Sequence, residues 1–104
     1  MGLNDIMRQA QQMQKKMTDL QEELAQRSVE ASAGGGRVTV KASGRLQLTE
    51  ITVDPAVVDP EDVGMLQDLI LAASNEALKK AREMIDGEMS KVTGGMKIPG
   101  MGLM

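Results

Sequence analysis

An apolar heptad in the first 25 residues limits the possible folds more than any other feature of the chain. Apolar residues step alternately by three and four positions, at Leu3, Ile6, Ala10, Met13, Met17, Leu20 and Leu24. They occupy positions a and d over about three heptads. The pattern predicts a helix over about residues 3–27, roughly 37 Å long. Because a compact domain of this size has a radius of gyration near ~13 Å, we expect the helix to project from the core or to pack on an equally long partner.

The apolar period changes to two between residues 28 and 53. Alternating apolar residues fall at Val29, Ala31 and Ala33, at Val38, Val40 and Ala42, and at Leu46, Leu48, Ile51 and Val53. Glycine-containing turns separate the three runs, which predicts an antiparallel meander. The glycines at 34–36 precede a strand and no Gly-Lys-Ser/Thr follows, so they fit a hairpin loop better than a phosphate-binding loop. The alternation slips between Leu48 and Ile51, which indicates a bulge or a strand buried on both faces.

A second long helix follows the strands. Asp59 is the expected N-cap and Pro60 the first helical residue, with Glu61 and Asp62 in the first turn. An apolar stripe at helical spacing then predicts a helix over about residues 60–92. We expect one domain over residues 1–93 and a flexible tail, rich in glycine and methionine, over residues 94–104. The predicted fold is α+β with the order α-β-β-β-α.

Two features of this protomer favour a homodimer. The small sheet leaves two strand edges open, and open edges pair readily with a second copy. The heptad seam of the first helix also requires a partner. Both arguments favour a two-fold symmetric homodimer.

The composition excludes several classes of function. The chain has no histidine, cysteine or aromatic residue, so the commonest general base, thiol chemistry and base-stacking platforms are all missing. The acidic residues between 54 and 62 fit helix caps better than a cation site. We therefore expect no enzyme, no cofactor, no metal and no small-molecule substrate. The longest apolar run has five residues, far short of a span of ~20 residues. We expect a cytoplasmic protein that does not enter a membrane.

The basic residues are the strongest candidates for a binding function. The first helix carries Arg8, Lys15 and Lys16 with the neighbouring Gln12, the second helix carries Lys79, Lys80 and Arg82, and Arg37, Lys41 and Arg45 lie on or beside the middle strand. Such side chains contact phosphates and base edges. The alternative is ordinary i,i+4 ion pairing, for which the sequence offers Lys15–Asp19, Glu23–Arg27, Glu76–Lys80, Lys79–Glu83 and Arg82–Asp86. With a net charge of −3, charge alone favours the alternative.

Several segments together resemble the YbaB/EbfC family of bacterial nucleoid-associated proteins. The resemblance covers essentially the whole chain. Its most specific parts are the Arg-Gln-Ala-Gln-Gln-Met stretch at residues 8–13 and the segment from Asp68-Leu69 to Asn75-x-Ala77. Val53-Asp54-Pro55 resembles the family's strand exit, and Gly95-Met96 with Pro99-Gly100 resembles its tail.

The resemblance implies a tweezer-like homodimer whose sheets join in the middle and whose long helices project. It also implies non-catalytic binding to double-stranded DNA and a place in nucleoid organisation or gene regulation. On helix position and charge, the DNA-contacting residues are expected among Arg8, Gln12, Lys15, Lys16, Lys79, Lys80 and Arg82. A protein–protein interaction module, using the heptad helix or the methionine-rich tail, is the alternative function.

Overall fold

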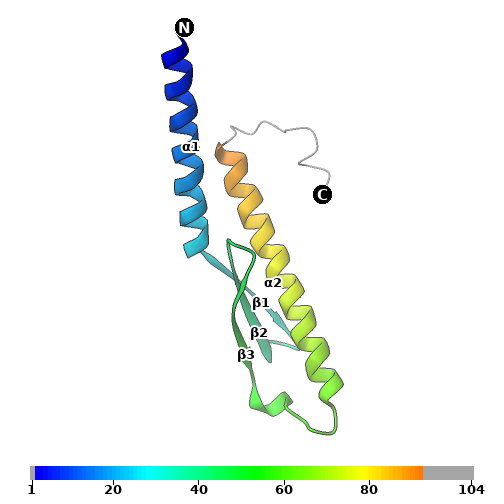
Figure 1. The fold of residues 1–104 in the computed structure, drawn as a ribbon. Helices are drawn as coiled ribbons and strands as arrows, with labels where there is room; N and C mark the ends of the chain where they lie inside the picture. The colour runs from blue at the N-terminus through cyan, green and yellow to red at the C-terminus, as the bar shows by residue number, and fades with distance from the viewer. Residues whose placement is uncertain (1, 93–104) are drawn as a thin grey trace.

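The computed structural model describes residues 2–92, so the expected tail at 94–104 lies outside the described residues. The chain runs through α1 (Leu3–Gln26), β1 (Ser28–Ala33), β2 (Val38–Ser43), β3 (Leu48–Val53), a short 3-10 helix η1 (Pro55–Val57) and α2 (Val63–Val92) (Figure 1). The strands form one antiparallel sheet in the order β1-β2-β3. The predicted α+β fold with a three-stranded meander is confirmed.

The core lies between α2 and one face of the sheet. It consists of Ala31, Val38, Val40 and Ala42 from β1 and β2, Ala73, Ala77 and Ala81 from α2, and Val57 from η1. Alanines at four-residue spacing form a smooth stripe, which lets the helix lie close against the strands. Most of the contact is with β1 and β2, and α2 touches β3 much less. One strand of the sheet is therefore largely uncovered.

The irregularity predicted in the third strand is a β-bulge. Lys41 pairs with Glu50 and Ala42 pairs with Leu48, so Thr49 is the extra residue. The alternative, a strand buried on both faces, is wrong, because five of the six residues of β3 are exposed. Leu46 lies before the strand, in the β2–β3 turn, with a left-handed φ of 59°.

The second helix begins three residues later than predicted. Asp59 forms a turn in which its Oδ1 accepts the amide of Glu61 at 2.9 Å. The N-cap is Asp62, whose Oδ1 accepts the amide of Met65 at 3.3 Å. Aspartate stabilises turns as well as helix N-termini, and here Asp59 forms the turn and Asp62 caps the helix.

The first helix projects from the body of the protein, as predicted (Figure 1). The molecule is elongated, with principal extents of 71 × 26 × 16 Å and a radius of gyration of 19.3 Å. Every residue from Leu3 to Lys16 is exposed, including the apolar heptad positions, and only Leu24 of α1 is buried. We call residues 3–16 the free arm.

Candidate nucleic-acid interface

The free arm carries four of the seven residues predicted to contact DNA. Arg8 and Lys15 are seven residues apart, so they lie on the same side of α1, two turns from each other. Gln12 lies between them and Lys16 is adjacent, and all four side chains are exposed. The apolar heptad positions occupy the opposite side of the helix. The arm therefore presents a polar, basic strip about 12 Å long to any approaching molecule.

Within the part of the chain that the structure describes, the cations of this strip form no ion pair. Of the five i,i+4 pairs that the sequence offers, only Glu23–Arg27 is present among residues 2–92. Arg27 also pairs with Glu88, Lys41 with Glu50, and Lys91 with Glu88. Among those five pairs only Lys15–Asp19 involves a cation of the strip, and that pair is not formed in the part of the chain that the structure describes.

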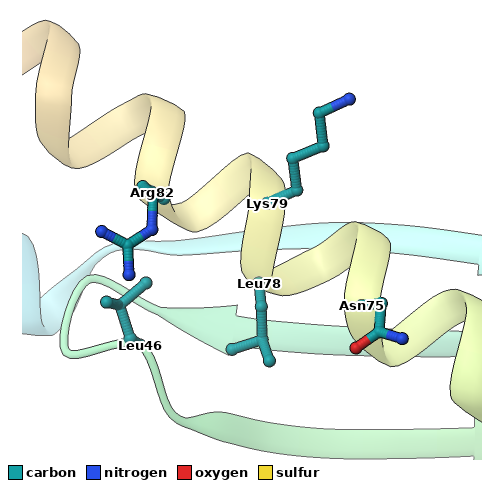
Figure 2. Close-up of a pocket in the computed structure, with 5 residues that line it drawn as sticks. All are labelled: Leu46, Asn75, Leu78, Lys79 and Arg82. Atoms are coloured by element: carbon teal, nitrogen blue, oxygen red, sulfur yellow. The ribbon is translucent and has the colours of Figure 1, made fainter. Parts of the chain in front are cut away.

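The basic residues of α2 do not form one cluster. The Nζ of Lys80 donates to the backbone carbonyl of Glu30 on β1 at 3.1 Å. Lys79 and Arg82 instead line a shallow pocket of about 370 Å³ together with Leu46, Asn75 and Leu78. Figure 2 shows the guanidinium of Arg82 beside Leu46, whereas Lys79 extends away from the sheet. Lys80 therefore lies on a different side of α2 from Lys79 and Arg82, because successive positions on a helix are ~100° apart.

The predicted contact residues fall into two separate sets. The free arm lies at one end of the molecule, and the α2 residues lie over the sheet (Figure 1). From Arg8 to Arg27, at the end of α1, the helix is about 28 Å long. One duplex contacts both sets only when it lies along the molecule, so the arm residues are the stronger candidates.

Arg45, one of the basic residues named beside the middle strand, is not among the seven residues expected to contact DNA. It lies in the β2–β3 turn, between Gly44 and Leu46, and it is exposed. The amide of Gly44 donates to the carbonyl of Leu24 at 3.1 Å, so this turn touches the base of α1. The fold thus places a further cation, without an ion pair among residues 2–92, close to the helix that carries the arm. Only the tertiary contact reveals this position.

Seven of the fifteen acidic residues gather away from the free arm, which itself carries Asp5. Residues 46–78 contain seven acidic residues and no basic one: Glu50, Asp54, Asp59, Glu61, Asp62, Asp68 and Glu76. This stretch forms β3, η1 and the first half of α2, and its connecting loops lie at the opposite end of the molecule from the N-terminus of α1 (Figure 1). The net charge of −3 therefore averages over a basic end and an acidic end.

No group of three metal-binding side chains lies together among residues 2–92. None of the helices in that part of the chain is both long and apolar enough to cross a bilayer. The pocket beneath Arg82 is open, and its lining surface is mainly apolar. The described structure thus offers surfaces rather than an enclosed site.

Comparisons with known proteins identify the family. The family model of the YbaB/EbfC DNA-binding family matches residues 1–96. A nucleoid-associated protein of Acetivibrio thermocellus is 61% identical over 101 residues, covering 96% of this chain and 89% of the relative. One from Alkaliphilus metalliredigens is 58% identical over 100 residues, covering 96% and 88%.

A solved structure has the same fold. The uncharacterized protein HP0035 from Helicobacter pylori superposes with a TM-score of 0.78 at 22% identity, covering 89% of this chain and 98% of that one. The match over nearly the whole length, together with the shared α-β-β-β-α order, shows that this chain belongs to the YbaB/EbfC DNA-binding family.

Proposed function

We propose that this protein binds double-stranded DNA as a homodimer, acts at the nucleoid and catalyses no reaction. The observation that carries the proposal is the free arm, a helix that projects from the body with Arg8, Lys15 and Lys16 exposed and outside every ion pair of the described residues. The family and the names of its nucleoid-associated members support it. They do not favour the interaction-module alternative.

The arm suits a duplex in shape as well as in charge. The major groove of B-DNA is about 12 Å wide and admits one α-helix. Arginine and lysine on the arm neutralise phosphates, and the amide of Gln12 hydrogen-bonds to phosphates or base edges. Because the cations of the arm are the groups that attract phosphates most strongly, we expect phosphate contacts to dominate and sequence preference to be weak.

The proposed homodimer uses the uncovered side of β3. Leu48 and Ile51 are paired with Ala42 and Val40, and directly opposed residues face the same side of a sheet. They therefore belong to the core face, yet 41% of Leu48 and 47% of Ile51 are exposed, because α2 lies mainly over β1 and β2. Leu71 on α2 is 61% exposed.

These side chains form one apolar strip. Leu71 lies on the same stripe of α2 as Asn75 and Leu78, which line the pocket with Leu46, in the turn before β3. We call Leu46, Leu48, Ile51, Leu71 and Leu78 the β3 strip. Exposed apolar patches rimmed by polar residues mark interaction sites, and a self-complementary patch beside a free strand edge suits a two-fold contact.

A lysine at the centre of the β3 strip is expected to break the dimer. Ile51→Lys would place a charge in the apolar contact, and light scattering should then give the mass of a monomer. Thr52→Lys is the matched control, since residue 52 is also exposed and faces the opposite side of the same strand. If the wild type is a dimer and the Ile51→Lys variant remains one, the interface lies elsewhere.

Titration of labelled duplex DNA at several salt concentrations tests the proposed DNA binding. If both arms of a dimer engage, six cations contact phosphates, and the log of the affinity should fall against the log of the salt concentration with a slope of about −5. Fluorescently labelled DNA is needed because the protein has no aromatic residue. Absence of binding at 50 mM salt would refute the proposal.

A further inference from the structure

The direction of the free arm is fixed only at its base. Between Leu3 and Lys16 every residue is exposed, and the side-chain hydrogen bonds of the described residues that reach this segment come from within α1, where Thr18 bonds to the carbonyl of Gln14. Nothing among residues 2–92 supports the arm from the side. Its angle to the body therefore depends on the contacts of the last two turns of α1.

The first of these contacts is with the β2–β3 turn. The amide of Gly44 donates to the carbonyl of Leu24 at 3.1 Å and to that of Arg27 at 3.2 Å. Leu24 is 3% exposed, so its side chain is held in the body. This contact fixes where α1 leaves the body. Met17, Leu20 and Ala25 of α1 are half-buried, so apolar packing also limits the tilt, and a directed bond to a second element defines it more sharply.

The second contact joins Arg27 to α2. The Nη1 of Arg27 donates to Oε1 of Glu88 at 2.9 Å, and Nη2 donates to Glu23, one turn back in α1. Lys91 donates to the same oxygen of Glu88 at 3.1 Å. The hydrogen bonds from Lys91 and Arg27 lower the pKa of Glu88, and those to Glu88 and Glu23 raise the pKa of Arg27. Both groups are therefore charged at neutral pH.

We propose that Arg27 and Glu88 are positioning residues that set the tilt of the free arm and thereby place Arg8, Lys15 and Lys16 for DNA contact. The ion pair adds a second fixed point, on an element different from the β2–β3 turn, and two points define a direction. The effect on DNA binding rests on the proposed function. The effect on the tilt does not.

The length of the arm makes a small tilt important. Arg8 lies about 28 Å along the helix from Arg27, so a tilt of 10° moves it by roughly 5 Å. Successive phosphates of one DNA strand are only about 3.4 Å apart along the axis. Loss of the contacts at the base of α1 would thus let the basic strip shift by more than the spacing between phosphates. Each binding event would then have to restrain the arm again, which lowers the affinity for DNA.

Glu88→Gln separates positioning from net charge. The substitution changes the net charge from −3 to −2, so electrostatics alone predicts equal or tighter DNA binding. The positioning role predicts the opposite, an affinity lower by roughly threefold to tenfold. Glu83→Gln is the matched control, because it removes the same charge from an exposed residue of α2 that forms no ion pair within the described part of the chain.

The tilt itself is measured without DNA. The chain has no cysteine, so spin labels can be placed at Gln11→Cys on the arm and at Glu76→Cys on α2. The doubly labelled protein is diluted with unlabelled protein, so that distances within one protomer dominate. We expect one narrow distance distribution for the wild type and for Glu83→Gln, and a broadened one for Glu88→Gln.

Each outcome decides the inference. An unchanged distribution in Glu88→Gln would overturn the positioning role, whatever the affinity. A broadened distribution with equal or tighter DNA binding would overturn its importance for DNA contact. If the wild type itself fails to bind DNA, the proposed function fails, and the distance distributions still decide whether Arg27 and Glu88 set the tilt.

Discussion

Gly44→Ala is expected to destabilise the protein by about 3 kcal/mol and to lower its melting temperature by roughly 10–20 °C. A Cβ at this position would collide with the backbone carbonyl of Leu24, and a backbone atom cannot rotate away as a side chain can. The β2–β3 turn would have to move off α1, breaking the two hydrogen bonds of the Gly44 amide and loosening the buried Leu24. Thermal unfolding followed by circular dichroism at 222 nm measures the change.

Gly87→Ala is the control, and its expected effect has the opposite sign. Gly87 lies inside α2, and a Cβ there would meet no atom within 4 Å. Alanine in a helix interior is more stable than glycine by about 0.5–1 kcal/mol. If the Gly44→Ala protein is as stable as the wild type, the contact between the β2–β3 turn and α1 accommodates the extra Cβ without loss of stability. The two-point anchoring of the arm would then be wrong.

Local patterns in the sequence were sufficient to predict the fold. The heptad from Leu3 to Leu24 predicts a long helix that projects or packs on a partner, and the slip between Leu48 and Ile51 predicts a bulge or a strand buried on both faces. The described structure has the projecting helix and a bulge at Thr49. Each is a matter of spacing within one element, which the backbone geometry converts directly into structure. The start of α2 at Val63 rather than Pro60 was missed, because Asp59 and Asp62 are both capable of capping and only the folded chain selects between them.

The candidate interface was only partly predictable. Exposure of Arg8, Lys15 and Lys16 follows from the heptad, since these residues lie away from its apolar side. Whether they are paired depends on side-chain conformations, and the one pair offered to them, Lys15–Asp19, is not formed among residues 2–92. Pairs such as Arg27 and Glu88, 61 residues apart, arise from tertiary contact alone.

The separation of charge explains how an acidic chain suits DNA. Seven acidic residues without a basic one occupy residues 46–78, and their repulsion of phosphates is screened over about 8–10 Å at moderate salt. Much of the arm lies farther than that from the acidic end, because the molecule is 71 Å long. On the proposed function, we therefore expect local charge on the arm, rather than the net charge, to govern binding.

Lys15→Gln/Lys16→Gln is expected to lower the affinity for duplex DNA at 50 mM salt by one to two orders of magnitude, because each engaged arm loses roughly two phosphate contacts. The slope of log affinity against log salt should become shallower by about 2 for each arm. Because both residues are exposed and outside the ion pairs of residues 2–92, the melting temperature should stay within a degree or two. Titration of fluorescently labelled DNA measures the affinity and the slope together.

Arg37→Glu distinguishes the effect of charge on the arm from the effect of net charge, because this variant has the same net charge as the Lys15→Gln/Lys16→Gln variant. Removing two positive charges takes the net charge from −3 to −5, and so does replacing one arginine by glutamate. Arg37 is exposed and lies in the β1–β2 turn, away from the arm. If the arm is the interface, the Arg37→Glu protein keeps nearly wild-type affinity and an unchanged slope. If both variants lose affinity equally, net charge governs binding, and the arm would lose its place as the DNA-contacting surface.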